Sequence, residues 1–298
     1  MKQTFLYLTI LSLFAIAVTG CSNSDNEYNA DTALSYYQPE EYEKTVSSIE
    51  ITYTKDNMDN WWIYNFVYDA HNRIKEINGT MNYYSNQNGT LNQNYIKREA
   101  TLQTKYYYDN ETLKIKSLYD TYIPQLDRRF TYNPVFYGCF DKEDGKLISF
   151  DAFDCEYEGL MLSKAHTDNG TSFGLEYDRN NNLVKAYQFD SLEINPVGKT
   201  VKEYNYSTLH KNATNIDFPS FFGYNIIERI VSFNTTHPYE IFHLGAFGML
   251  GGRSTHLPEG EWEFKNDTIM HNNKSVVIEY PVKYTSSNKF VYNIKYKE

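Results

Sequence analysis

Apolar and polar residues alternate along short stretches of this chain, and polar turns separate one stretch from the next. Over residues 61–68, Trp62, Tyr64 and Phe66 occupy every second position, and Asn65 stands between two of them. A period of two is typical of a β-strand with one face buried. The pattern therefore predicts a strand with a dense aromatic face.

The same alternation is regular near the end of the sequence. Residues 276–284 and 290–296 each place aliphatic or tyrosine side chains at every second position, and the polar residues 285–288 lie between them. Two alternating runs around a short polar turn predict a β-hairpin.

A tyrosine–aspartate pair recurs where strands are expected to end. It occurs as Tyr68-Asp69, as Tyr108-Asp109 and as Tyr177-Asp178, each followed by polar residues and a second alternating run. An aspartate side chain accepts hydrogen bonds from backbone amides shortly after it, which favours a turn. We interpret the unit as a hairpin that sets the strand register, with a looser copy after Phe140.

The composition agrees with an all-β chain. Aromatic residues make up 17% of the 298 residues, including 29 Tyr and 18 Phe. Tyrosine suits half-buried strands because its ring packs while its hydroxyl reaches water. The sequence predicts a single antiparallel β domain over residues 46–298, built as a large meander with a strongly curved or barrel-like sheet.

One segment interrupts the meander. Residues 215–257 are rich in Phe, Ile, Gly and Pro, and Phe242, Leu244 and Phe247 follow roughly helical spacing. We expect one long, partly helical crossover that covers the sheet. The alternative is a mobile lid over an apolar ligand cavity, with Phe242 and Phe247 as ligand contacts.

The first residues predict export and lipid attachment. Lys2 precedes the apolar run 5–18, and Val18-Thr19-Gly20-Cys21 matches a bacterial lipobox. We expect a lipoprotein signal peptide at 1–20 and an acylated Cys21 on a flexible acidic spacer at 21–45. The protein would then sit in the cell envelope at the outer membrane, facing the periplasm or the surface, with the bilayer as partner. A plain secretory signal is the alternative.

The two other cysteines are Cys139 and Cys155. An oxidising compartment would permit a disulfide between them. If Asp144-Gly145 forms a tight turn, Cys139 faces Phe150 instead, so a bridge requires a longer loop or an adjacent strand. The sequence leaves both outcomes open.

Charge and histidine spacing exclude several functions. The formal net charge is −10, and no stripe of Lys or Arg stands out, so nucleic acid is not an expected partner. None of the 7 His lies in a metal-ligand pattern. No metal or cofactor is expected, and the domain is expected to be monomeric.

Three short sites match an Asp-Ser/Thr-apolar pattern of envelope O-glycosylation. The acceptor residues would be Thr32, Ser191 and Thr268. Ordinary turns and helix caps produce the same pattern, so the alternative is structural.

The functional hypothesis depends on the aromatic strand. Trp61, Trp62 and Tyr64 could stack on sugar rings, although cross-strand packing in the core is the favoured explanation for them. No GxSxG, Walker A or other catalytic motif occurs, so no catalytic residue is assigned. We expect a non-catalytic binding module for a glycan, peptide or lipid. The alternatives are a hydrolase of envelope or other polysaccharides that uses paired carboxylates, and a structural scaffold.

Two family resemblances follow from these motifs. Tyr68, Asp69, Arg73 and Ile74 resemble the YD-type repeats of Rhs-like shells. The lipobox, the Tyr-Asp hairpins and the Gly-rich segment 244–258 together resemble Bacteroides-type lipoproteins of unknown function with a porin-like β fold. That resemblance implies a large curved antiparallel meander, and it implies no activity.

Overall fold

The computed structural model describes residues 44–55, 58–86, 95–109, 111–142, 145–151, 153–159, 161–166, 172–189, 199–223, 244–249, 253–286 and 289–298. Cys21 and the predicted signal peptide and spacer up to residue 43 lie outside these ranges. The first strand begins at Val46, where the β domain was expected to start.

Strands dominate the described part of the chain. A 16-stranded antiparallel sheet holds all of them except β14 and β15, which form a separate pair. The bounds are β1 Val46–Lys55, β2 Met58–Tyr68, β3 Ile74–Asn86, β4 Tyr95–Tyr108, β5 Thr112–Ile123, β6 Arg128–Tyr132, β7 Val135–Phe140, β8 Leu147–Phe150, β9 Phe153–Glu158, β10 Met161–His166, β11 Ser172–Tyr177, β12 Leu183–Phe189, β13 Lys199–Glu203, β14 Tyr206–Lys211, β15 His256–Pro258, β16 Glu261–His271, β17 Lys274–Thr285 and β18 Val291–Tyr296. The helical elements in these ranges are η2 Pro124–Leu126 and α2 Phe218–Gly223.

The large sheet is a meander with one join between distant strands. Its order is β13-β12-β11-β10-β9-β8-β7-β5-β4-β3-β2-β1-β18-β17-β16, with β6 beside β5. The predicted terminal hairpin is confirmed, because β17 pairs with β18. In addition, β18 pairs with β1, and Ile51 lies opposite Tyr292.

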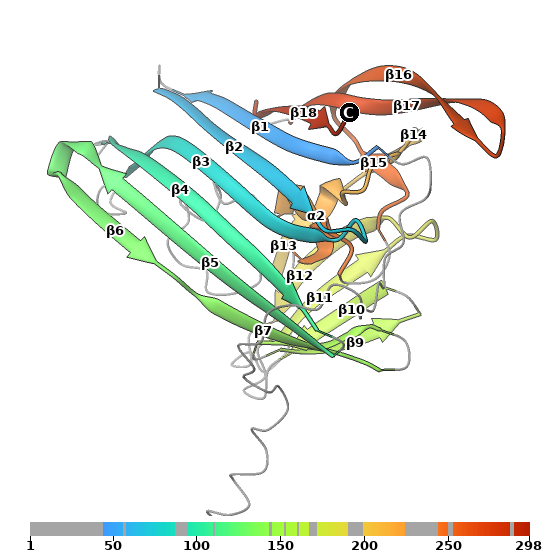
Figure 1. Ribbon diagram of the computed structural model, residues 1–298, viewed down its shortest axis with the longest axis horizontal. Helices are drawn as coiled ribbons and strands as arrows, with labels where there is room; N and C mark the ends of the chain where they lie inside the picture. The colour runs from blue at the N-terminus through green and yellow to red at the C-terminus, as the bar shows by residue number, and fades with distance from the viewer. Residues whose placement is uncertain are drawn as a thin grey trace, which may run out of the picture.

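The sheet is curved but open. It bends around α2, so that β9–β13 lie behind the layer formed by β1–β5 (Figure 1). Its outermost strands, β13 and β16, do not pair with each other. The curved form of the predicted meander is therefore observed, and the closed, barrel-like form is wrong.

Alternation on β2 separates an inner face from an outer face, as predicted. Trp62, Tyr64 and Phe66 are buried, whereas Asn65 and Val67 are exposed. Burial of one large apolar side chain contributes about 1.5–3 kcal/mol to folding. The inner face, which carries Trp62, thus supplies much of the core, and the opposite surface is called the outer face below.

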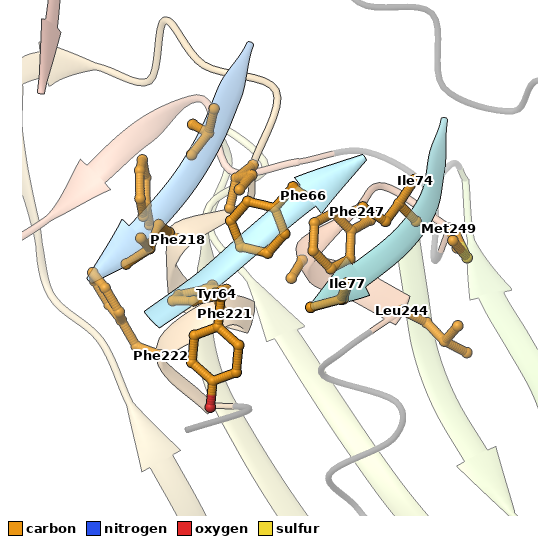
Figure 2. Packing of buried hydrophobic residues seen from close by; sticks show 14 of the residues in the cluster. Tyr64, Phe66, Ile74, Ile77, Phe218, Phe221, Phe222, Leu244, Phe247 and Met249 are labelled. Atoms are coloured by element: carbon orange, nitrogen blue, oxygen red, sulfur yellow. The ribbon is translucent and has the colours of Figure 1, made fainter. Parts of the chain in front are cut away.

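An internal plug fills the curve of the sheet. It consists of α2 and residues 244–249, and its aromatic rings pack on β2 (Figure 2). Phe66 lies with its ring centroid 6.2 Å from that of Phe221 and 5.4 Å from that of Phe247. The described part of the 215–257 segment thus packs against the inner face of the sheet.

The predicted helical crossover is not seen as a whole. Within 215–257, the structure describes α2 and one helical turn at 244–246. Residues 224–243 and 250–252, including Phe242, lie outside the described residues. Phe247 is only 7% exposed and belongs to the core, so its surface is not open to a ligand.

A buried carboxylate fixes the plug. Asp217 Oδ1 accepts the backbone N–H of Ser254 at 2.8 Å, and Oδ2 accepts the backbone N–H of Ser220 at 3.0 Å and also the Ser220 hydroxyl. The Asp217 N–H donates to the carbonyl of Ala246 at 3.0 Å. Burial raises the pKa of the Asp217 carboxyl, although the hydrogen bonds from Ser220 and Ser254 act in the opposite direction.

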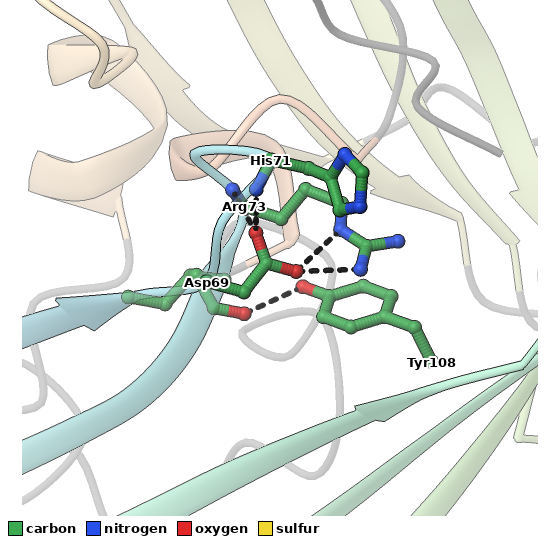
Figure 3. Close-up of polar contacts among 5 residues, drawn as sticks. Asp69, His71, Arg73 and Tyr108 are labelled. Carbon is green, nitrogen blue, oxygen red and sulfur yellow. Dashed lines mark hydrogen bonds and ion pairs between the residues drawn. The ribbon is translucent and has the colours of Figure 1, made fainter. Parts of the chain in front are cut away.

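The Tyr-Asp unit forms the predicted turn (Figure 3). Asp69 Oδ1 accepts the backbone N–H groups of His71 and Arg73 at 2.8 and 3.0 Å, and Oδ2 accepts Arg73 Nε at 2.7 Å. Asn72 has φ 58°, a left-handed conformation that asparagine tolerates better than most residues. Tyr108 lies under the Arg73 guanidinium, 4.2 Å from ring centroid to Cζ, and its hydroxyl donates to the Ile74 carbonyl at 2.7 Å.

The third copy of the unit repeats this geometry. Asp178 Oδ1 accepts the N–H groups of Asn180 and Asn182 at 2.8 and 2.9 Å, and Asn181 has φ 61°. Burial raises the pKa of Asp178, but the hydrogen bonds from Asn182 and Asn180 outweigh it and leave the pKa below its usual value. The interpretation of the unit as a turn opened by aspartate is confirmed for these two copies.

Cys155 is a free thiol, so of the two outcomes that the sequence left open, a bridge between Cys139 and Cys155 is not formed. Cys139 lies on β7, opposite Ser149 of β8, whereas Cys155 lies on β9, opposite Ala165 of β10. The two strands flank β8 and are not neighbours. Burial raises the pKa of the Cys155 thiol to about 12.

Among the described helices, none is both long enough and apolar enough to span a membrane.

Candidate functional site

The two adjacent tryptophans point to opposite faces of the sheet. Trp62 is 1% exposed and Tyr64 is 3% exposed, so both belong to the core. The Trp62 ring stacks on Tyr83 with 6.4 Å between centroids. Of the predicted stacking residues, only Trp61 lies on the outer face, where it is half-buried. The core interpretation is therefore confirmed for Trp62 and Tyr64.

A row of side chains begins at Trp61 and crosses five strands. Trp61 of β2 lies opposite Asn82 of β3, and Asn82 lies opposite Glu99 of β4. Glu99 lies opposite Tyr122 of β5, and Tyr122 lies opposite Arg129 of β6. Directly paired positions on an antiparallel sheet share one face. The five side chains thus form one continuous row on the outer face.

A second row runs beside the first, two residues away from it along each strand. Thr80 of β3 pairs with Thr101 of β4, and Thr101 pairs with Asp120 of β5. The two rows line an open groove of about 410 Å³, called the outer groove here. Its volume lies within the range of ligand sites.

Ion pairs and hydrogen bonds order the end of the outer groove at β6. A guanidinium nitrogen of Arg129 lies 3.3 Å from Asp120 Oδ2, and Arg129 Cζ lies 6.0 Å from the centroid of the Tyr122 ring. The Tyr122 hydroxyl donates to Asp127 Oδ1 at 3.0 Å, and this bond raises the pKa of Tyr122. The hydrogen bond to Asp127 therefore fixes the position of the Tyr122 ring.

Glu99, in the middle of the row, is also paired. Lys97 Nζ donates to Glu99 Oε1 at 2.9 Å, and this bond raises the pKa of the lysine. Both carboxylates of the outer groove thus have a cationic partner.

Two oxygen atoms in the walls of the outer groove lack hydrogen-bond donors. Asn82 Oδ1 and Asp120 Oδ1 are buried and have no hydrogen-bond partner. A buried acceptor without a donor costs about 1–3 kcal/mol. Both side chains line the groove, and a donor bound there would reach either oxygen only after the side chain rotates.

The side-chain amide of Asn60 stabilises the strands at the Trp61 end of the outer groove. Asn60 Nδ2 donates to the carbonyls of Tyr53 and Met58, both at 3.1 Å, and Asn60 Oδ1 accepts the N–H of Tyr84 at 2.8 Å. One buried side chain thus links β1, β2 and β3 next to Trp61. This support favours a preformed site.

A second groove of about 570 Å³ lies over β9–β12. Glu156, Glu158, Glu176 and Lys164 line it, and Lys164 Nζ lies 3.7 Å from Glu156 Oε1. The ring of Tyr187 covers Gly174, where an added Cβ would lie 2.3 Å from the ring. This groove is mainly acidic and lacks the alternation of rings and polar groups seen in the outer groove.

The other predicted site residues do not gather at either groove. Thr268 lies exposed on β16, and its backbone N–H donates to Asp267 Oδ1 at 2.8 Å. Thr32 and Ser191 lie outside the described residues. Glycosylation of the three residues stays a prediction.

Sequence reasoning missed Asn82, Glu99, Asp120, Tyr122 and Arg129. They come from four strands, and each one alone is an ordinary polar or aromatic strand residue. Strand register is the signal that unites them, and it follows from the pairing of β2 to β6.

The chain was compared with protein families, with curated proteins and with solved structures, and only the solved structures gave matches. No family model and no curated protein matches the chain. A porin-like protein from Bacteroides uniformis is 12% identical, with a TM-score of 0.42 over 85% of this chain and 98% of its own. A porin-like protein from Bacteroides vulgatus is 11% identical, with a TM-score of 0.27 over 85% of this chain and 99% of its own. The solved structures to which this chain is similar thus include porin-like proteins from Bacteroides.

Proposed function

We propose that this protein is a non-catalytic glycan-binding module of the cell envelope, and that the outer groove is its binding site. The observation that carries the proposal is the row in which aromatic rings alternate with amide, carboxylate and guanidinium groups. Rings can pack on the apolar faces of sugars, while the polar groups exchange hydrogen bonds with hydroxyls. Asn82 Oδ1 and Asp120 Oδ1 have no hydrogen-bond donor, and the hydroxyl groups of a sugar could supply one.

The structure favours a glycan over the other two ligands considered. A lipid requires an enclosed apolar cavity, whereas the outer groove is open and lined largely by polar side chains. A peptide that adds a strand requires a free sheet edge. The strands β2 to β5, which form the floor of the outer groove, are each paired on both sides. A ligand that lies over these four strands must therefore bind through side chains.

Glycan binding to a soluble Cys21→Ser variant tests the proposal. We expect binding to at least one glycan on an array, followed by a loss of affinity of about tenfold or more in Trp61→Ala, measured by calorimetry. The matched control is Phe130→Ala. Phe130 is 53% exposed on β6, next to Arg129 but on the opposite face. Equal losses in the two variants, or no binding to any glycan, would contradict the proposal.

The membrane tether is a separate part of the proposal. Acyl chains on Cys21 would hold the module at a bilayer without a spanning segment, because each buried CH₂ contributes about 0.8 kcal/mol. The Cys21→Ser substitution should move the protein from the membrane fraction to the soluble fraction. An unchanged distribution would refute lipid attachment and would leave glycan binding unaffected.

One observation favours a hydrolase as the second candidate. Glu99 and Asp120 both line the outer groove, and they are diagonal neighbours on β4 and β5. Such positions lie about 7–8 Å apart, which is compatible with a pair of catalytic carboxylates. Each carboxylate is ion-paired, however, and a general acid must carry a proton. Release of reducing ends from a bound glycan, abolished in both Glu99→Gln and Asp120→Asn, would establish the hydrolase instead.

A further inference from the structure

The two aromatic rings of the outer groove are separated by a defined number of strands. Trp61 lies on β2 and Tyr122 on β5, at paired positions of the same row. Neighbouring strands are about 4.8 Å apart, so three strand spacings place the two positions about 14 Å apart. A single pyranose ring is much shorter than this distance and cannot contact both aromatic residues.

The positions between the two rings are polar. Asn82 and Glu99 each contribute one hydrogen-bonding side chain from β3 and β4, directly between Trp61 and Tyr122. Thr80 and Thr101 run alongside them in the second row. A ligand that contacts both rings must therefore pass over a floor of amide, carboxylate and hydroxyl groups, and it must cross the strands.

The charges of the outer groove balance one another. Glu99 is paired with Lys97, and Asp120 is paired with Arg129. A charged ligand would have to compete with one of these existing pairs. Hydroxyl groups can instead donate to the exposed carboxylate oxygen of Glu99 without breaking a pair.

We infer that the outer groove binds a neutral oligosaccharide, laid across β2 to β5 with separate sugar units over Trp61 and Tyr122. This inference rests on the proposed function and adds ligand length, direction and charge to it. It predicts that affinity depends on chain length, because only a ligand that spans the row reaches both rings.

A length series tests the inference. The probes are malto-, cello-, xylo- and manno-oligosaccharides of one to six units, with oligogalacturonates as the anionic set, titrated into the soluble Cys21→Ser protein. We expect affinity for at least one neutral series to rise about tenfold or more between the monosaccharide and the hexasaccharide, because the second ring is then engaged. Oligogalacturonates of equal length should bind more weakly.

Variants locate the two sugar contacts. Tyr122→Ala should lower the affinity for the hexasaccharide about tenfold and leave that for the disaccharide unchanged, whereas Trp61→Ala should lower both. Tyr122→Phe keeps the ring and removes the bond to Asp127, so it should retain hexasaccharide binding within about twofold. Circular dichroism and thermal unfolding check that each variant is folded.

The outcomes separate this inference from the proposed function. If monosaccharides bind as tightly as hexasaccharides, or if Tyr122→Ala affects all lengths equally, the spanning arrangement is wrong and glycan binding stands. Tighter binding of oligogalacturonates would overturn the neutral ligand. If no glycan binds, both the inference and the proposed function fail.

Discussion

The plug and the outer groove both place polar groups beside aromatic rings, but only in the plug do these groups have all their hydrogen-bond partners. In the plug, both oxygens of Asp217 accept hydrogen bonds from Ser220 and Ser254. In the outer groove, Asn82 and Asp120 each retain an oxygen without a donor. The satisfied group fixes the position of the plug, whereas the unsatisfied groups suit a partner from outside the chain.

The adjacent tryptophans give the largest expected contrast between the two regions. Trp62→Ala should lower the free energy of unfolding by about 3–5 kcal/mol, since it opens a cavity in the core beside Tyr83. Trp61→Ala should lower it by less than about 1 kcal/mol, since the side chain faces the outer groove. Urea denaturation of both variants measures the difference. Similar losses would show that the division between a structural and a binding face is incorrect.

Removal of the buried carboxylate should have the next largest effect. Asp217→Ala leaves the donors of Ser220 and Ser254 unpaired and should cost about 3 kcal/mol of unfolding free energy. Asp267→Ala is the matched control, because Asp267 pairs with Lys44 at the surface and should contribute far less than Asp217. A loss below that of the control would mean that Asp217 does not hold the plug.

The pH dependence of stability should differ in sign between Asp217 and Asp178. Since the pKa of Asp217 is raised, its contribution is fully present below its unfolded-state pKa and is lost as pH rises through the folded-state value. Since the pKa of Asp178 is lowered, its contribution is present above the unfolded-state pKa and is lost as pH falls.

Two variants separate these contributions. The stability difference between the wild type and Asp217→Asn should shrink from pH 3 toward neutral pH, and the difference for Asp178→Asn should grow over the same interval. Thermal unfolding at several pH values provides the measurement. Parallel trends in the two variants would contradict the assigned shifts.

The turns should show the smallest effect. Asn72 and Asn181 adopt left-handed backbone conformations, so replacement by Val should cost about 1–2 kcal/mol, and replacement by Gly should change stability by less than about 0.5 kcal/mol. Chemical denaturation measures both substitutions. Val and Gly variants of equal stability would show that the turn geometry is not required.

Local patterns predicted the strands and the turns because their causes are local. The alternation around Trp62 and the hydrogen bonds of Asp69 both arise within a few residues, and both are confirmed. The fully buried positions of Trp62 and Tyr64 could not be separated from that of Trp61, because the location of the plug decides which face of β2 is covered. No short pattern encodes that location.

The outer groove was not predicted either, because it also depends on contacts between residues that are distant in the sequence. Its row joins Trp61 to Arg129 through four strand pairings, and a shift of one residue in any pairing would move a side chain to the other face. Such a shift occurs as a bulge near Tyr68, at the far end of β2 from the row. The number of residues in each turn therefore determines whether the row exists.

The pairing of β1 with β18 has a consequence for how the domain folds. Strands far apart in the sequence meet in the interior of one sheet, so the sheet is complete only after β18 has been synthesised. Contacts so distant in sequence carry a large loop-closure entropy and slow folding. Until β18 arrives, one edge of β1 presents unpaired amides and carbonyls, and such an edge is prone to intermolecular association. The newly made protein is thus most vulnerable to aggregation just before its final strand docks.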